Sequence, residues 1–289
     1  MTFSVITPTF NPGEWLPCCV ASVADQQGVQ CDHVIQDGGS TDGTKAYLQG
    51  ESRVRSFVEQ DSGMYDAFNR GWDRSEGDFV AHLNADEQLL PGALTAIRAC
   101  FEAHPEADVV ISGTLICDGD GNLLCYRRPI RPPLSLLLTS YHPTLTCSIF
   151  LRRSAFRMRP FLYDPSFRHI SDALFMIDIL RSQIPIVLLD RFTSVFTWTG
   201  ENIGLSGSAK LRKEYAYQHS LAPGSLRFAR NFIRYGFWLR KLMAGHYSRR
   251  HLEYSIYTRK SPQARKQFET YSARGIYRPA ATKPKDERN

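Results

Sequence analysis

Four short polar clusters in the first ninety residues each follow an apolar run. Their sequences are TPTFN from Thr7, DGGS from Asp37, DSG from Asp61 and NADE from Asn84. If the clusters meet, their carboxylates repel one another unless a cation or hydrogen-bond donors compensate the charge. A hard divalent ion, Mg²⁺ or Mn²⁺, completed by diphosphate oxygens and water would do so. Taken singly, each cluster is equally typical of an ordinary turn, where Asp, Gly, Ser and Asn are common.

The elements around these clusters alternate between strand and helix patterns. We expect strands at 4–10, 33–36, 54–60 and 78–84, and helices at 14–26, 41–48 and 64–74. This alternation predicts an α/β fold with a doubly wound, mixed but mainly parallel sheet flanked by helices. In such a sheet the carboxyl ends of the strands share one edge, where ligands bind. The four clusters should therefore lie close together.

The pattern changes after residue 108. Residues 109–129 are typical of a hairpin that turns at Asp120 and Gly121. The DGDGN sequence in it resembles the start of a calcium loop, but Leu123 and Pro129 stand where such a loop needs Gly and Glu, so we interpret it as a turn. We expect a strand at 145–152, a helix at 172–180 and helical structure after Pro223.

The composition is that of a globular protein, with 43% hydrophobic and 22% charged residues. The seven cysteines are scattered and form no CxxC pair, which predicts reduced thiols in a cytoplasmic protein rather than disulfides or a zinc site. The first residues predict a strand rather than a signal peptide. No GxGxxG follows that strand, which argues against a dinucleotide-dependent oxidoreductase.

Three stretches, SVITPTFN, IQDGGSTDGT and DSGMYDAFNRGWDRSEGDFVAHLNADE, occur in the order and spacing of a known family. Together they resemble the family 2 glycosyltransferases of the GT-A fold, in particular inverting enzymes of bacterial surface-polysaccharide assembly, including the colanic-acid type. The resemblance covers roughly residues 3–210. It implies a catalytic domain at 1–222, with a nucleotide-binding half at 1–100 and an acceptor-binding half at 101–222. A catalytically silent module that binds a nucleotide-sugar or a glycan is the alternative.

The resemblance implies roles for residues in each cluster. Thr7, Pro8 and Thr9 would line the base pocket, and Asp37 and Asp61 would contact the nucleoside of a nucleotide-sugar donor, a UDP-sugar in our reading. The NAD sequence corresponds to the family's DxD motif, so Asn84 and Ala85 would contact the donor and Asp86 would bind Mn²⁺ or Mg²⁺. Glu87 matches a further acid that often follows. Two departures are Asn84, in place of the first Asp, and Phe68, where many relatives carry an Arg near the diphosphate.

The stretch FLYDPSFRHISDALFMIDIL resembles the family segment that supplies the general base. The resemblance assigns that role to Asp172, which would remove the proton of an acceptor hydroxyl. A simple helix cap by Asp172 or Ser171 is the structural alternative. His142 matches a family histidine that contacts the acceptor or the metal, although a lone His is as often purely structural.

Residues 197–215 resemble the family's mobile loop over the diphosphate. Its glycines would provide mobility, and Ser206 and Ser208 would donate hydrogen bonds. Arg212 or Lys213 would replace the cation that is missing at Phe68. A solvated surface loop followed by a charged helix is the alternative.

Charge is divided unevenly along the chain. Residues 223–289 hold 16 Lys and Arg against 4 Asp and Glu, whereas residues 1–222 have a net charge of −6. In LRFARNFIRYGFWLRKLM the cations Arg227, Arg230, Arg234 and Lys241 form one helical stripe, which suits an anionic membrane surface and a glycan or lipid-linked acceptor. The predicted location is therefore cytoplasmic, peripheral on the inner face of the membrane. A solvated helix packed on the domain is the alternative, and the segment lacks the motifs of a nucleic-acid binder.

Overall fold

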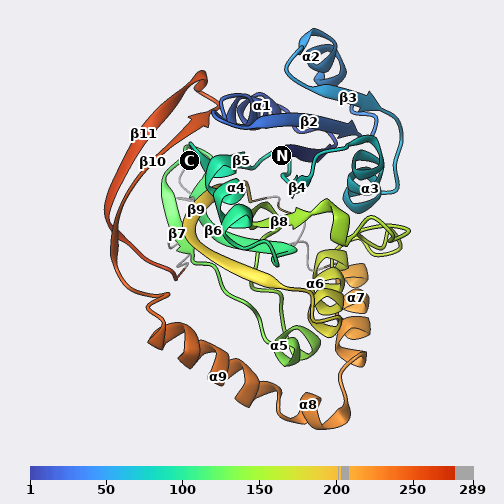
Figure 1. Cartoon of the computed structure of the whole chain (residues 1–289), viewed down its shortest axis with the longest axis vertical. Coiled ribbons are helices and arrows are strands. Elements are labelled where there is room, and N and C mark those ends of the chain that lie inside the picture. The colour runs from blue at the N-terminus through green and yellow to red at the C-terminus, as the bar shows by residue number, and fades with distance from the viewer. Residues whose placement is uncertain (201, 203–207, 277–289) are drawn as a thin grey trace, which may run out of the picture.

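The computed structural model describes residues 1–200, 202 and 208–276 and is built on one nine-stranded sheet (Figure 1). The strand order is β3-β2-β1-β4-β8-β6-β9-β5, and β7 pairs with β6. A separate two-stranded sheet, β10-β11, runs along one side of the molecule from the end of α9 to α1.

The first half of the sheet is parallel and follows the predicted alternation. Its strands are β1 (Thr2–Thr9), β2 (Gln30–Asp37), β3 (Arg55–Val58) and β4 (Phe79–His82). The helices between them are α1 (Trp15–Ala24), α2 (Thr44–Gly50) and α3 (Met64–Arg74). Each of these elements lies within a few residues of its predicted position, because the apolar periodicity is unbroken here.

The second half of the sheet is mixed. Its strands are β5 (Gln88–Leu89), β6 (Val109–Asp118), β7 (Leu123–Arg127), β8 (Ile149–Arg152) and β9 (Ile186–Trp198). Only β6 and β9 pair in parallel in this half, so the sheet is less parallel than predicted. The hairpin β6–β7 confirms the interpretation of DGDGN as a turn, since Asp118 Oδ1 accepts the backbone N–H groups of Asp120 and Asn122.

Two hydrophobic cores lie on opposite faces of the sheet, because successive strand residues point to opposite sides. Val5, Ala81 and Val110 face one core, whose helices are α1 and α4 (Ala93–Ala103). Their neighbours Ile6, Val80 and Ile111 face the other core, which α3 and α6 (Ser171–Arg181) cover. All seven cysteines are unpaired and six are buried, as predicted for reduced thiols.

The C-terminal segment is helical only in part, which corrects the expectation of a helical extension. Helices α7 (Ala209–Ser220), α8 (Gly224–Phe228) and α9 (Arg230–Met243) are followed by strands β10 (Arg250–Thr258) and β11 (Ser261–Ala273). The strands share a core with the main sheet, in which Tyr254 and Ile256 join Leu115 and Val195. The alternation of apolar and polar residues in HLEYSIYT has the strand period of two, a signal that the aromatic and basic character of the segment obscured.

The hairpin β10–β11 is fixed to the main sheet by polar contacts as well. Arg265 forms a two-pronged ion pair with Asp25 on α1, and the amide of Gln88 exchanges two hydrogen bonds of 2.9 Å with the backbone of Tyr257. Gln88 begins β5, which directly follows the NADE cluster. The hairpin therefore supports the strand that comes immediately after that cluster. In the described part of the chain, no helix has the length and apolar character needed to cross a bilayer.

Candidate functional site

The four polar clusters lie at one edge of the sheet, as the alternation predicted. In the strand register Thr9 is opposite Asp37, Asp37 is opposite Val58, and Ile6 is opposite His82. The carboxyl ends of β1, β2, β3 and β4 therefore coincide. The N–H of Gly38 donates to Thr9 O at 2.9 Å, which ties the first two clusters together.

The two threonine side chains of the TPT sequence at the end of β1 lie in different environments. Thr7 is fully buried and its hydroxyl pairs with His33 Nε2 at 2.9 Å. Burial lowers the pKa of His33 to about 3, so this pair is uncharged. Thr9 is also buried, and its hydroxyl has no hydrogen-bond partner among the described residues. Of the three residues Thr7, Pro8 and Thr9, only Thr9 therefore has a hydroxyl that remains available to a ligand. Pro8, which lies between the two threonines, is buried.

Asp37 and Asp61 face each other across the ends of β2 and β3. Asp37 accepts two hydrogen bonds from Ser40, and Asp61 accepts the N–H of Gly63 at 2.8 Å. Burial, followed by the charges of Asp66 and Asp37, raises the pKa of Asp61. A Cβ atom at Gly38 would stand 2.7 Å from Asp61 Oδ2, so the absence of a side chain there permits the close approach. Two carboxylates are therefore held at the edge where a nucleoside would offer hydroxyl and N–H donors.

The NADE cluster forms a tight turn after β4. Glu87 is buried, and its Oε2 accepts the N–H of Asn84 at 2.7 Å, which holds the turn closed. His82 Nε2 lies 3.0 Å from Asn84 Oδ1. Burial lowers the pKa of His82 to about 4, so the neutral ring donates to that oxygen and leaves the amide nitrogen of Asn84 for a ligand. Ala85 is buried against the core of α1 and β2.

Asp86 and Glu87 carry the features expected of a cation site. Burial raises the pKa of both carboxyl groups, and the charge of Asp86 raises that of Glu87 further. Glu87 Oε1 is buried and unpaired within the described residues. Asp86 Oδ2 accepts only a long hydrogen bond of 3.3 Å from Asn202 among the contacts described. A divalent ion fits this pair of hard oxygen donors, with Asp86 as the more exposed ligand.

Asp172 lies on the first turn of α6 and contacts a different part of the chain through each oxygen. Tyr65 OH donates to Oδ1 at 2.9 Å, and His142 Nδ1 lies 3.6 Å from Oδ2, beyond hydrogen-bond length. Burial by itself would raise the pKa of Asp172, but His142, Tyr65 and the N–H of Ala173 outweigh it and keep the pKa below its ordinary value. Ile170 is the N-cap of α6, and the hydroxyl of Ser171 has no hydrogen-bond partner among the described residues, so Ser171 does not cap the helix. The N–H of Ala173 in the first turn does reach Asp172, so a helix-end contact and a role as base remain compatible for that carboxylate.

An aromatic cluster connects the Asp172 site to the NADE turn. The ring of Tyr163 packs against Tyr65 at 5.2 Å and against Phe68 at 4.9 Å, and Phe68 lies 4.5 Å from His82. Phe68 is fully buried and packs against His82, the partner of Asn84, and against Tyr163. The ring of Tyr163 in turn contacts Tyr65, the partner of Asp172. The apolar character of Phe68 therefore has a packing reason at a position where many members of the resembled family carry an Arg. Sequence reasoning missed Tyr65 and His82, although both lie inside the motifs that carried the resemblance.

Buried polar atoms without partners gather in the two segments that flank Asp172. Both ring nitrogens of His142 and the hydroxyl of Thr144 are unpaired in one segment, and His169 Nδ1 and the hydroxyl of Ser171 in the other, as far as the described residues go. Unpaired buried groups of this kind are rare in native proteins and call for a ligand or water. The Asp172 side of the site is therefore suited to a hydroxyl-rich molecule.

The predicted mobile loop is described only in part. Ser208 is the N-cap of α7 and accepts the N–H of Leu211 at 3.1 Å, so its hydroxyl has a structural role. Arg212 and Lys213 are exposed on α7. Ser206, Gly204 and Gly207 lie outside the described residues. Among the described residues of this loop, Asn202, which sequence reasoning did not single out, reaches Asp86.

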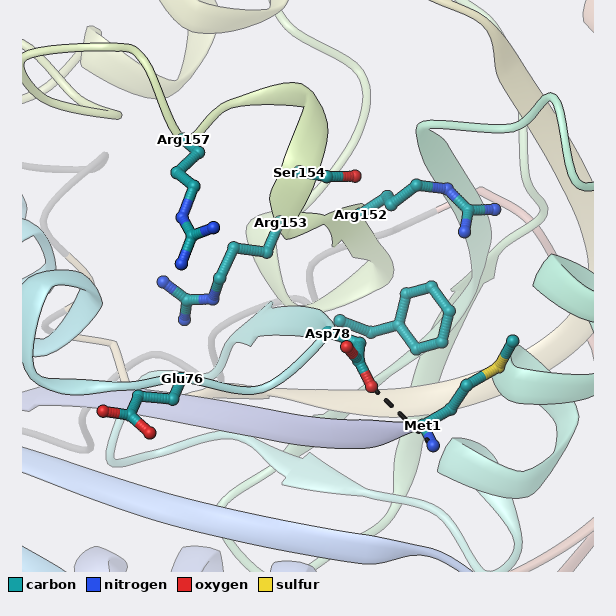
Figure 2. A pocket seen from close by; sticks show the side chains of 8 residues that line it. Met1, Glu76, Asp78, Arg152, Arg153, Ser154 and Arg157 are labelled. Carbon is teal, nitrogen blue, oxygen red and sulfur yellow. Dashed lines mark ion pairs between the residues drawn. The ribbon is translucent and has the colours of Figure 1, made fainter.

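A hollow of about 270 Å³ lies away from these residues, at the opposite edge of the sheet (Figure 2). Arg153 beside it is held by the carbonyl groups of Gly77 and Trp72 and by Ser75, and Asp78 pairs with the amino group of Met1. Arg153 and Asp78, two of the charged residues that line it, thus already have partners within the protein. We therefore place the functional site at the carboxyl edge. The group of three potential metal ligands found in the described residues, His251, Glu253 and Glu269, is exposed on β10–β11 and also lies apart from this edge.

The fold is an α/β architecture of the GT-A type, with acidic and amide side chains gathered at the carboxyl edge of its sheet. The family model "Glycosyl transferase family 2" matches residues 4–161, more than half of the chain. The chain therefore belongs to glycosyl transferase family 2.

Curated relatives and solved structures agree with this assignment. A PGL/p-HBAD biosynthesis glycosyltransferase of Mycobacterium bovis is 36% identical over 120 residues, which are 39% of this chain and 46% of the relative. The GalNAc(5)-diNAcBac-PP-undecaprenol beta-1,3-glucosyltransferase of Campylobacter jejuni is 30% identical over 126 residues, 42% of this chain and 40% of the relative. The matches thus span less than half of these relatives.

Two solved structures share the fold at low sequence identity. S. aureus TarS 1-349 in complex with UDP-GlcNAc has a TM-score of 0.56 at 19% identity and covers 84% of this chain and 73% of its own. The mannosyltransferase PcManGT from Pyrobaculum calidifontis, in complex with GDP-Man and Mn²⁺, has a TM-score of 0.55 at 15% identity and covers 80% and 69%.

Proposed function

We propose that this protein is an inverting glycosyltransferase that moves one sugar from a nucleotide-sugar to a glycan or lipid-linked glycan acceptor in bacterial surface-polysaccharide biosynthesis. The observation that carries the proposal is the placement of Asp172. This carboxylate is kept ionised by Tyr65 and His142, and an aromatic cluster joins it to the turn that bears Asn84 and Asp86. Residues that would bind the sugar donor and a carboxylate that would act as the general base thus lie at one edge of the sheet.

Residues 1–100 hold the donor in this proposal. Thr9, Asp37 and Asp61 contact the nucleoside, with Thr7 and Pro8 supporting that pocket, and Asn84 and Ala85 approach the sugar diphosphate. Uridine is the base we favour. The TarS complex contains UDP-GlcNAc and the archaeal mannosyltransferase complex contains GDP-Man, so the fold accepts either nucleoside class.

Asp86 holds a divalent ion, Mn²⁺ or Mg²⁺, with Glu87 fixing the turn behind it. Such an ion supplies charge stabilisation for the departing nucleoside diphosphate. Because Asn84 replaces the first carboxylate of the motif, diphosphate oxygens and water would have to supply the remaining ligands of such an ion. Exposed Arg212 or Lys213 on α7 adds positive charge near the diphosphate.

Residues 101–222 position the acceptor. Asp172 removes the proton of the acceptor hydroxyl while its oxygen attacks the anomeric carbon opposite the departing diphosphate, which inverts the anomeric configuration. The unpaired polar atoms of His142, Thr144 and Ser171 offer hydrogen bonds to further acceptor hydroxyls. The relative from Campylobacter jejuni is named for an undecaprenol-linked acceptor, which favours a lipid-linked acceptor and a position on the inner face of the membrane.

The decisive experiment is turnover of a panel of UDP- and GDP-sugars with Mn²⁺ present, first as hydrolysis and then with short glycan and polyprenol-linked acceptors. We expect one donor to be consumed, with the product carrying the inverted anomeric configuration by NMR. Saturable binding of a nucleotide without turnover of any donor would instead support a silent binding module.

A further inference from the structure

Helices α8 and α9 expose an unusual number of large apolar side chains. Phe228 is 91% exposed, Phe232 78% and Met243 76%. The other exposed apolar residues of these helices are Tyr235, Trp238, Leu239 and Leu242. Contiguous apolar surface of this extent on a folded protein marks an interaction site.

The exposed apolar residues of α9 fall on one side of the helix. At the 100° step of an α-helix, Phe232, Tyr235, Leu239, Leu242 and Met243 lie within about 100° of arc. The opposite side packs on the body, where Phe237 joins Ile130 and Leu136 in a small core and Lys241 is buried. We call the five exposed side chains the outer face of α9.

This arrangement revises the sequence-based picture of a basic stripe lying on a surface. Lys241, a member of that stripe, faces the body, and burial lowers its pKa to about 8. Arg240 is exposed about 60° beyond Met243, and Arg234 is exposed on the other side of the helix, about 40° beyond Trp238 and next to buried Lys241. The surface is therefore an apolar strip with cationic margins.

The charge of the segment selects the kind of partner. Residues 224–250 contain seven Lys and Arg and no Asp or Glu. Arg227, Arg230, Arg234 and Arg240 form no ion pair with a carboxylate in the part of the chain that the structure describes. Two copies joined through this face would set cations against cations, so a second copy is disfavoured and an anionic partner is favoured.

The apolar strip narrows the choice among anionic partners. A bilayer surface offers acyl chains for the strip and lipid phosphates for its arginine margins, whereas a nucleic acid offers phosphates but no apolar surface. Trp238 and Tyr235, whose rings stack at 5.7 Å, are the residue types that favour the membrane–water interface. Residues 277–289 contain no large apolar side chain besides Tyr277, so that segment lacks the chemistry to cover the strip.

We infer that α9 docks on an anionic membrane through its outer face, with Arg234 and Arg240 on the lipid phosphates. The contact also orients the site, because Tyr141 packs edge-on against Phe237 at 6.5 Å and the next residue, His142, faces Asp172 at 3.6 Å. The docked helix thus brings the acceptor side of the site toward the lipid surface. This last step rests on the proposed transferase function, whereas the docking does not.

Sedimentation of the full chain with vesicles of phosphatidylcholine alone, or with 30% phosphatidylglycerol, tests the inference. We expect binding only to the anionic vesicles. Phe232→Ser combined with Leu239→Ser should reduce the partition coefficient at least tenfold. Met158→Ser combined with Phe161→Ser, which removes exposed apolar residues elsewhere, should leave it unchanged.

The charge margins are tested separately. Arg234→Gln combined with Arg240→Gln should weaken binding by about 25-fold, about fivefold for each arginine near the surface. Arg131→Gln combined with Arg157→Gln removes the same charge from exposed positions outside the segment and should weaken binding less than threefold. The inference would be overturned if the two double substitutions weakened vesicle binding equally, or if the wild-type chain bound both kinds of vesicle equally.

Oligomeric state and nucleotide binding complete the experiment. A wild-type dimer that Phe232→Ser with Leu239→Ser dissociates in analytical ultracentrifugation would identify the face as a self-interface and overturn membrane docking. Thermal shifts with UDP and Mn²⁺ should be the same for every variant, which shows that each is folded. Vesicle binding without any turnover of donor would contradict only the proposed transferase.

Discussion

The hydroxyl of Tyr65 donates a 2.9 Å hydrogen bond to Asp172, a residue 107 positions later in the chain. Tyr65 lies on the first turn of α3, in the half proposed to bind the nucleotide, and Asp172 lies on the first turn of α6, in the half proposed to bind the acceptor. The bond therefore crosses between the two halves of the proposed site and holds one oxygen of the base, leaving the other toward His142. The charges and dipoles around Asp172 come from Tyr65, His142, Tyr163, Tyr215 and His82.

Replacing Tyr65 with Phe tests this role. The variant loses a donor to the ionised form of Asp172, so the pKa of that carboxyl group rises and a larger fraction is protonated at a given pH. We expect the acidic limb of the kcat profile to move up by about 1 pH unit, because a hydrogen bond to a charged group contributes about 1.5 kcal/mol. KM for the donor should hardly change.

Tyr163→Phe is the matched control for that experiment. Tyr163 is also a buried tyrosine of the aromatic cluster, but its hydroxyl lies 3.4 Å from His82 Nδ1 and is not bonded to Asp172. An acidic limb that moves equally in both variants would mean that Tyr65 acts only through packing.

Asp172→Asn should abolish transfer while leaving the donor bound. The amide keeps the size of the side chain and its bond to Tyr65 but does not accept a proton, so we expect kcat to fall by about 10³-fold. UDP affinity by calorimetry with Mn²⁺ should stay within twofold. Asp178→Asn, on an exposed position of the same helix, serves as the control, and transfer at the wild-type rate by Asp172→Asn would remove Asp172 as the base.

Asp86→Ala should weaken the metal-dependent part of UDP binding. The variant loses the more exposed of two adjacent carboxylates, so the stabilisation that Mn²⁺ adds to the UDP complex in a thermal-shift assay should largely disappear. Asp73→Ala, an exposed carboxylate on α3, should keep it. An unchanged Mn²⁺ effect in Asp86→Ala would place the metal elsewhere.

Gly38→Ala should reduce nucleotide affinity without unfolding the protein. The added methyl group would stand 2.7 Å from Asp61 Oδ2, so that carboxylate must move away from the position it shares with Asp37. We expect about a tenfold rise in the Kd for UDP, roughly the effect of one lost hydrogen bond. Gly50→Ala meets no atom within 4 Å and should bind UDP normally.

Arg265→Met should destabilise the protein through the hairpin β10–β11. The Arg265 side chain is 11% exposed and pairs with Asp25 through two nitrogens, so its removal leaves a partly buried carboxylate without its partner. We expect a loss of about 2 kcal/mol in the free energy of unfolding by urea. Lys260→Met, which removes an exposed ion pair with Asp120, should have no measurable effect. Equal stability of the two variants would show that the hairpin is held by its apolar core alone.

The sequence determined much of the nucleotide-binding half. Local apolar periodicity and turn residues are encoded within a few positions of one another, so the strands before Asp37 and Asn84 and the helix at 64–74 were predictable. The common edge of the four clusters also followed, because parallel strands separated by helices must align their carboxyl ends.

Tertiary structure decided what depends on contacts far apart in sequence. The partner of Asp172 is Tyr65, and Asn84 is held by His82. Phe68 is apolar because its ring packs against His82 and Tyr163. The C-terminal strands form because their apolar face completes a core with β6 and β9, and the outward side of α9 is fixed by the burial of Phe237 and Lys241. Sequence alone gives the periodicity of a face, but only the packed neighbours determine whether that face is covered or open to a partner.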